Sequence, residues 1–529
     1  MTSLVIHQSP ILLLLFVLVL LPSPSLCRAP RPPSRSTTCG DKLCEIDIKN
    51  KLNARQNPLD FLYLQEWDFN LRDRCEFCPQ GDESGIVVTI LGLFELTVDN
   101  EERKEGKWEL EAANLAVRHI NEQNILGPKY KLALIVNDTK CDPGVGLDAF
   151  FHALYTRKEK MAFLLGTSNS EVTESLSKVI PYWNMLQVSF GSTSPALSIK
   201  KEFPHFYRTV APDSSHNLAR IEFLRRFSWE TVTIFSQNED VYSLAVNDLV
   251  TELEQSNISC GATITFAEAD INDQLKILRE LDTRIIIGSF SHSVAPKVFC
   301  EAYSLGMYGE DYAWLIQGRP KDRWWMKTDV CGDNLSKATN GIIFIASFDS
   351  LIGNLTASSG LLESDIEEML EGKSGDYIRQ TYDAVWAIAL TLRSFMLYMS
   401  IEDFDYNRRD MSRQLSKEMS KTTFNGISGP VRFNGPDRIG FTALYQIQGG
   451  DSVMVGLFDG FEKELTMPCS GCKPVVWPGD QVPISKRVFK LRTVTVQPVA
   501  FFSIATFSMI GIGVAMIFLI ANLHFRKHK

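Results

Sequence analysis

Two short loops rich in hydroxyl groups are the segments best suited to hold a small polar molecule. The first, GTSNS at 166–170, directly follows one apolar run, and the second, GSTSP at 191–195, follows the next. Hydroxyls and free backbone N–H groups at the start of a helix can hold a carboxylate or a phosphate. Ser170 can equally well serve as a helix cap that accepts a hydrogen bond from a backbone N–H group. Because two such loops follow neighbouring strands, the anion site and the cap stand as equal alternatives.

The sequence contains no recognisable catalytic set. No G-x-S-x-G elbow, H-E-x-x-H or P-loop occurs, and the histidines, 8 in all, do not lie at metal-ligand spacing. We therefore predict no enzyme activity, no cofactor and no metal site. The net charge of −9 argues against a nucleic-acid partner, which would need a clustered basic face.

Two apolar segments predict a secreted, membrane-anchored chain. Residues 11–21 are too few to cross a bilayer, which takes about 20 residues in a helix, so they predict a signal peptide cleaved after Cys27. Residues 499–523 carry no formal charge and precede the basic tail at 524–529, so they predict one membrane helix whose basic end is cytoplasmic. We expect a type I, single-pass protein of the plasma membrane, with the middle of the chain outside the cell.

The glycosylation and cysteine patterns fit this route. Asn-x-Ser/Thr sequons occur at Asn137, Asn257, Asn334 and Asn354. The pairs Cys75-x-x-Cys78 and Cys469-x-x-Cys472 have the spacing of zinc ligands, but they lie far apart in sequence. Since disulfides are the usual state of cysteines outside the cell, we favour disulfides over zinc at both pairs.

From residue 85 onward, short apolar runs alternate with amphipathic stretches. The predicted strands are 86–94, 131–136, 162–165, 186–190, 231–235, 262–266, 284–287 and 341–348. The predicted helices are 109–124, 144–157, 170–180, 242–254, 273–281, 292–303 and 380–397. Such alternation is typical of parallel sheets built from βαβ units, and the strands are too many for one compact sheet. A meander of 431–433, 442–447 and 453–457 is expected to complete the second lobe.

These patterns predict an α/β fold of two doubly wound lobes with a cleft between them, followed by one C-terminal transmembrane helix. The predicted segments are a signal peptide at 1–27, a Pro-rich leader and Cys-containing extension at 28–84, the two-lobed module at 85–465, a linker at 466–497, the membrane helix at 498–523 and a tail at 524–529. Lobe 1 is expected at about 85–210 and 341–410, and lobe 2 at about 211–340 and 411–465.

Several motifs make the chain similar to the GABA-B receptor subunit family. They are LLGTSNS at 164–170, YWNM at 182–185, SFGSTSPALS at 189–198, FYRTV at 206–210, KVFCEAY at 297–303, TYDAVWA at 381–387, EDFDYN at 402–407 and GISGPVRF at 426–433. The resemblance implies a type-I periplasmic-binding-protein fold, which is a receptor ligand-binding fold that closes on amino-acid-like ligands. It also implies pairing with a second subunit of the family, mainly through the first lobe.

The resemblance further implies which first-lobe residues face a ligand. The serines that hold the ligand carboxylate fall on Ser170 and on Thr193, which is followed by Ser194. The histidine that helps to hold the ligand amine is replaced by Val210, and the acid that pairs with the amine falls on Tyr377.

These replacements predict that carboxylate chemistry is kept and that GABA specificity is lost. An ammonium group taken out of water needs an anionic or hydrogen-bonding partner, and Asp376 could supply one only by turning inward. In the second lobe, the family tyrosine falls on Ser291 and the family tryptophan on Arg319, while the first-lobe tryptophan aligns near Arg103. If Arg319 faces the cleft, it favours a ligand with a second negative group; the alternative is a solvated loop residue.

The family also offers a pattern of cysteines. It implies a disulfide between Cys300 and Cys331. Cys141 matches a family cysteine whose usual partner position is Asn169 here, so Cys141 is free or pairs elsewhere, with Cys260 as the candidate.

Two functions fit these features. The first is a GABA-B-receptor-like subunit in G protein-coupled receptor signalling, which either binds a small amino-acid-like ligand or pairs as a heterodimer with a ligand-binding subunit. The second is a single-pass clearance or decoy receptor of the same fold. The motifs favour the first.

Overall fold

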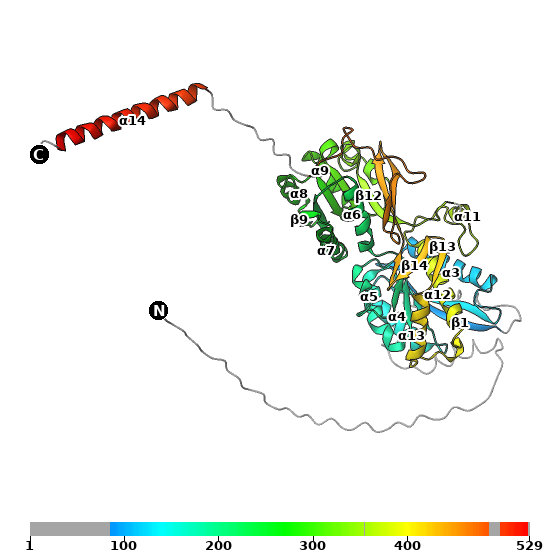
Figure 1. The fold of residues 1–529 in the computed structure, drawn as a ribbon. Coiled ribbons are helices and arrows are strands. Elements are labelled where there is room, and N and C mark those ends of the chain that lie inside the picture. The colour runs from blue at the N-terminus through cyan, green and yellow to red at the C-terminus, as the bar shows by residue number, and fades with distance from the viewer. Residues whose placement is uncertain (1–84, 354, 486–497, 527–529) are drawn as a thin grey trace, which may run out of the picture. The chain divides into compact units, whose positions relative to one another are not determined.

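The computed structural model describes residues 85–485 and 498–526, except for Asn354 (Figure 1). The predicted signal peptide, the leader and the extension up to residue 84 lie outside the described residues, as do Cys75, Cys78 and the sequon at Asn354.

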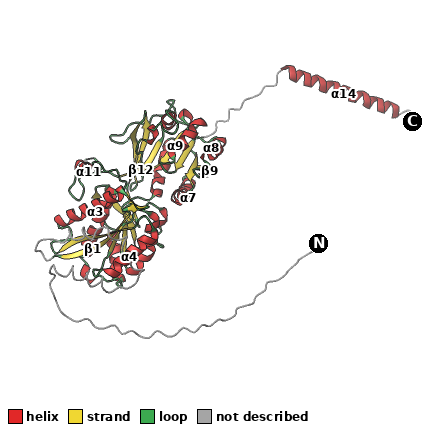
Figure 2. Cartoon of the chain, turned by 180° about the vertical axis from the view of Figure 1, so that it is seen from behind, coloured by secondary structure: helices red, strands yellow, loops and turns green. Residues whose placement is uncertain are grey.

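Lobe 1 is built on a 5-stranded parallel sheet with the order β4-β1-β5-β6-β7. Its strands are β1 (Ile86–Phe94), β4 (Tyr130–Asp138), β5 (Phe163–Leu165), β6 (Leu186–Ser189) and β7 (Phe206–Arg208). Its helices are α3 (Lys104–Glu122), α4 (Pro143–Thr156), α5 (Ser170–Val179), α11 (Glu363–Met369), α12 (Ile378–Phe395) and α13 (Arg409–Met419), and the short strands β2 (Thr97–Val98) and β3 (Glu101–Glu102) precede α3. β1 is a nearly continuous apolar run because helices cover both faces of a parallel sheet (Figure 2).

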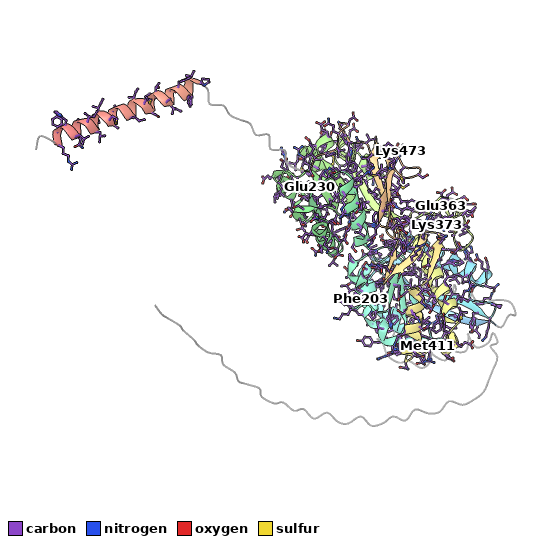
Figure 3. All side chains as sticks on the ribbon, in the orientation of Figure 1. Phe203, Glu230, Glu363, Lys373, Met411 and Lys473 are labelled. Carbon is purple, nitrogen blue, oxygen red and sulfur yellow. A yellow bond between two sulfur atoms is a disulfide. The ribbon has the colours of Figure 1, made fainter. Side chains whose placement is uncertain are left out.

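The core of lobe 1 joins parts of the chain that are far apart in sequence. α12 packs against α3, and Met411 (labelled in Figure 3) and Leu415 of α13 belong to the same buried cluster as Leu91 and Phe163. The first lobe therefore needs helices that come after the second lobe in the chain.

Lobe 2 is built on an 8-stranded mixed sheet with the order β18-β17-β16-β12-β11-β10-β8-β9. Its strands are β8 (Thr231–Gln237), β9 (Ser259–Phe266), β10 (Ile285–Ser289), β11 (Ala313–Gln317), β12 (Ile343–Phe348), β16 (Phe441–Gln448), β17 (Asp451–Asp459) and β18 (Glu464–Thr466). Its helices are α6 (Asn217–Arg226), α7 (Asp240–Gln255), α8 (Ile271–Glu280), α9 (Ala295–Ser304) and α10 (Asn334–Thr339).

A separate 3-stranded antiparallel sheet connects α13 to the last strands of lobe 2. It consists of β13 (Thr423–Gly426), β14 (Gly429–Asn434) and β15 (Asp437–Ile439). Phe424, Ile427 and Val431 belong to the buried cluster of lobe 1, so this sheet packs on the first lobe.

The βα alternation predicted from the sequence is confirmed, whereas the division between the lobes differs. β12, expected in lobe 1, pairs in parallel with β11 and antiparallel with β16, and so lies in the sheet of lobe 2. The segment from α13 to β14, whose larger part was expected in lobe 2, packs on lobe 1 instead. The pattern also missed β7, β11 and α6.

The first part of the predicted linker is folded onto lobe 2. The backbone N–H of Lys473, which is labelled in Figure 3, donates to the carbonyl oxygen of Met454 in β17 at 2.9 Å. The ring of Trp477 contacts those of Phe227 and Trp229, at centroid distances of 5.1 and 5.6 Å. Residues 466–485 are therefore part of the second lobe's surface.

The last described element is α14 (Pro498–Arg526), which is long and apolar enough to cross a membrane. Its 29 residues exceed the roughly 20 that a helix needs to cross a bilayer. The helix includes the whole predicted membrane segment.

Candidate ligand-binding site

The two hydroxyl-rich loops leave the same edge of the lobe 1 sheet. β5 and β6 pair in parallel, so the loops at 166–170 and 191–195 begin side by side at their carboxyl ends. The first loop turns at Gly166, whose φ is 117° and where a Cβ would lie 2.1 Å from the carbonyl oxygen of Leu93. Only glycine fits this position without moving the backbone of β1.

The start of α5 is capped by Asn169 and not by Ser170. The side-chain oxygen of Asn169 accepts hydrogen bonds from the N–H groups of Glu171 and Val172, at 2.9 and 3.1 Å. Ser170, in the first turn, accepts instead from the N–H group of Ser194 at 3.2 Å. Of the two alternatives for this loop, capping is thus carried out by Asn169, and Ser170 does not cap the helix.

A carboxylate of the protein itself also lies at this loop. Glu95, directly after β1, is only 1% exposed, and it accepts hydrogen bonds from the N–H groups of Ser168 and Asn169, both at 3.1 Å, and from the Ser168 hydroxyl. Arg103 lies near Glu95 and pairs with the buried Glu109, where two guanidinium nitrogens approach the carboxylate oxygens at 3.2 Å. Burial raises the pKa of Glu109 to about 7.

Asp213 lies beside Thr193. The sequence analysis did not identify this acid as part of the site. The backbone N–H of Asp213 donates to the carbonyl oxygen of Thr193 at 3.1 Å. Burial raises the pKa of the Asp213 carboxyl, while Thr193, Gln317 and the guanidinium groups of Arg220 and Arg208 act against that rise. The Thr193 end of the site is therefore already beside an acidic group of the chain.

Ser194 and Tyr377 complete the first-lobe positions predicted by resemblance. The Ser194 hydroxyl donates to Glu174 of α5 at 3.0 Å. Tyr377 immediately precedes α12, and its ring lies so close to the second loop that a Cβ built on Gly191 would be 2.8 Å from Cδ2. Burial raises the pKa of Tyr377 well above its usual range, so its hydroxyl stays neutral.

An ammonium group would find no unpaired anion at the positions expected to hold it, among the residues that the structure describes. Val210 is buried and apolar, and the phenol of Tyr377 is neutral. Asp376, the possible substitute, is exposed and forms an ion pair with Lys321 of lobe 2.

The second-lobe candidates lie after neighbouring parallel strands, β10 and β11. The Ser291 hydroxyl is 2.7 Å from that of Ser293, and the Ser291 N–H donates to the Gln237 side chain at 3.0 Å. Arg319 forms an ion pair with Asp349 at 3.0 Å, so its charge is already partnered within the chain.

The cysteines follow the expected pattern in part. Cys300 and Cys331 form the disulfide that the resemblance implies, and Cys469 and Cys472 form a second one, as favoured over zinc. Cys141 is not joined to Cys260, contrary to the candidate pairing. The Cys141 sulfur instead accepts a hydrogen bond from the Asn169 side chain at 3.3 Å.

Of the predicted sequons, Asn137, Asn257 and Asn334 lie within the described residues. Asn257 is exposed, in the turn between α7 and β9. Asn137 and Asn334 are half-buried, and the Asn137 amide donates to the carbonyl of Ala149 at 3.4 Å.

Comparison with known proteins identifies the kind of module to which these loops belong. Residues 109–449 match the family model described as the receptor family ligand binding region. The chain is 30% identical over 466 residues to the human (Homo sapiens) gamma-aminobutyric acid type B receptor subunit 2, an alignment that covers 83% of this chain and 48% of the relative. It is 28% identical over 435 residues to subunit 1 of the same receptor type from Mus musculus, which covers 78% of this chain and 44% of the relative.

A more distant relative gives the same result. Subunit 1 from Caenorhabditis elegans is 26% identical over 463 residues, covering 84% of this chain and 51% of the relative. The chain thus spans about half the length of the curated relatives it matches. The match includes both lobes and both hydroxyl-rich loops, and on this evidence the chain belongs to the family of receptor ligand-binding regions, as a member similar to the GABA-B receptor subunits.

Proposed function

We propose that this chain is a GABA-B-like receptor subunit that pairs with a ligand-binding subunit and does not itself hold GABA. In this role its two-lobed module lies outside the cell and α14 anchors it in the plasma membrane. Signalling through a G protein is then a property of the receptor complex.

The side chains at the position of the ligand amine favour pairing with another subunit over ligand binding. At the positions where the family holds the ligand amine, the described side chains are an apolar valine, a neutral tyrosine and an aspartate paired with Lys321. Desolvating an ammonium group without an anionic partner costs several kcal/mol, which is enough to abolish binding of a small amino acid.

The carboxylate end supports the same choice. The hydroxyl of Ser170 accepts from Ser194, that of Ser194 donates to Glu174, and Thr193 lies beside Asp213. A ligand carboxylate would have to displace contacts that the chain already makes, which weakens its net binding free energy.

The experiment combines a binding test with a pairing test on the full chain. Thermal unfolding of the detergent-purified protein is followed with GABA, glutamate and a panel of amino and dicarboxylic acids, because a ligand at 100 times its Kd stabilises the folded state by about 2.7 kcal/mol. In parallel, the chain is co-expressed with mouse subunit 1 or subunit 2, and purified through a tag on the partner.

We expect no ligand-dependent shift in Tm and stoichiometric co-purification with one of the two subunits. A saturable shift that Ser170→Ala abolishes would contradict the non-binding role and establish a working binding site. A chain that binds a ligand but co-purifies with neither subunit would instead support a clearance or decoy receptor.

A further inference from the structure

One of the two loops expected to receive a ligand carboxylate already holds a carboxylate from the protein. Glu95 is 1% exposed, and both of its carboxylate oxygens accept hydrogen bonds from this loop: one from the N–H of Asn169, the other from the N–H and the hydroxyl of Ser168. Backbone N–H groups that converge on an anion are the donors by which such a loop holds a ligand.

The neighbouring donors are also used internally. The N–H groups of Glu171 and Val172 donate to the Asn169 side chain, and the N–H group of Ser194 donates to Ser170. The backbone N–H groups of residues 168, 169, 171, 172 and 194 therefore each have an acceptor within the chain.

The backbone around Glu95 holds the carboxylate in place. The N-terminal turn of α3 packs so closely against it that a Cβ on Gly106 would lie 2.1 Å from the Glu95 carbonyl oxygen. Arg103 donates to that same carbonyl at 3.4 Å and pairs with Glu109, so a positive charge lies beside the two buried carboxylates. A buried carboxylate is stable only with such hydrogen bonds and a nearby cation.

We propose that Glu95 is an internal ligand, whose carboxylate occupies the anion-binding loop of lobe 1 and excludes a free carboxylate from it. The loop is thereby held in an occupied arrangement without any small molecule. This inference rests on contacts within lobe 1 alone and is independent of whether the chain pairs with another subunit.

The test is chemical rescue of the full chain in detergent. Glu95→Ala removes the methylene carboxylate and leaves a space that matches acetate, while Glu95→Gln keeps the size and removes the charge. Melting temperatures are measured in acetate, in pivalate (the same charge with a branched chain) and in chloride at equal ionic strength.

We expect Glu95→Ala to lower Tm by several degrees and millimolar acetate to restore more than half of that loss in a saturable way. Pivalate and chloride should not restore it, and acetate should leave the wild type and Glu95→Gln unchanged. An equal response of all three proteins, or no acetate-specific rescue of Glu95→Ala, would overturn the proposal.

Hydrogen exchange on the wild type keeps the proposal testable even if Glu95→Ala does not fold. Peptides that contain residues 166–172 should exchange slowly without any ligand, and acetate or GABA should not slow them further. Protection of this loop that appears only on adding a carboxylate would show that Glu95 does not occupy it. Neither result depends on co-purification with a partner, so this proposal and the proposed function can fail separately.

Discussion

His216 lies directly before α6, where the chain passes into lobe 2, and both of its ring nitrogens are next to hydroxyl groups. Nδ1 is 3.0 Å from the Thr442 hydroxyl, and Nε2 is 3.4 Å from that of Ser347. Burial lowers the pKa of His216 to about 3, and the charge of Arg220 adds to the effect. The ring is therefore neutral in the folded protein throughout the physiological pH range.

This neutral histidine should make the module sensitive to acid. Because the folded pKa lies below the unfolded value of 6.5, the contribution of His216 is present above about pH 6.5 and is lost as the pH falls toward 3. Between about pH 7 and pH 5, we expect the wild type to lose about 2 kcal/mol more of its free energy of unfolding than His216→Gln. Chemical unfolding at the two pH values measures the difference; equal losses in both proteins would contradict this assignment.

At the candidate site, the sequence pointed to the two hydroxyl-rich loops, and the resemblance singled out Ser170, Thr193 and Ser194 within them. Neither pointed to the acids Glu95 and Asp213 beside these loops. Glu95 and Asp213 were missed because an isolated acid has no motif. An acid directly after an apolar strand, as in the run ILGLFEL, was the available signal.

At the scale of elements, a buried hydrogen-bond network joins α12 to the three-stranded sheet, with the Ser428 hydroxyl between the charged groups of Asp383 and Arg438. Asp383 of α12 accepts hydrogen bonds from the N–H groups of Ile427 and Ser428, at 2.8 and 2.9 Å. Arg438 of β15 donates to the Ser428 hydroxyl at 2.6 Å and to the Thr209 carbonyl at 2.9 Å. Because Thr209 directly follows β7, the network connects the three-stranded sheet to the point where the chain first leaves lobe 1.

Breaking this network should destabilise the protein more than any surface change nearby. We expect Arg438→Met to lower the free energy of unfolding by about 3 to 5 kcal/mol, because the buried Asp383 then loses its charge partner. Arg432→Met on the adjacent strand is the matched control, since Arg432 is exposed, and it should cost less than about 1 kcal/mol. Similar losses for the two variants in urea unfolding would show that the network does not stabilise the fold.

Elements with strong local patterns were predicted well, whereas their assignment to lobes was not. β1 was predicted with its observed bounds, and α12 within two residues at each end. β7 was missed because three residues carry no periodicity, and β12 was placed in the wrong lobe because its sheet is decided by pairing with β16, far along the chain. Local sequence carries no record of such long-range pairing.

At the scale of the whole molecule, the membrane topology has a direct chemical marker. Asn257 is exposed on lobe 2, within the sequon Asn257-Ile258-Ser259. If the module is translocated, we expect Asn257 to carry an N-linked glycan in mammalian cells, and Asn257→Gln to remove one step of glycosidase-sensitive mobility on a gel.

Asn272→Gln provides the control, because Asn272 is also exposed on lobe 2 but is not in a sequon. It should leave the mobility unchanged. If mass spectrometry finds Asn257 wholly unmodified in protein from the cell surface, the predicted glycosylation is wrong. Unmodified protein that never reaches the surface would place the module on the cytoplasmic side of α14.

The dependence of lobe 1 on α12 and α13 also has a consequence for biosynthesis. The ribosome releases the strands of lobe 1 first, but the helices that complete its core follow only after residues 211–377 have been made. At ordinary translation rates that delay is on the order of 10 to 30 s. During this interval β5 and β6 lack the packing that α12 and α13 later provide, so the nascent chain should depend on chaperones until these helices emerge.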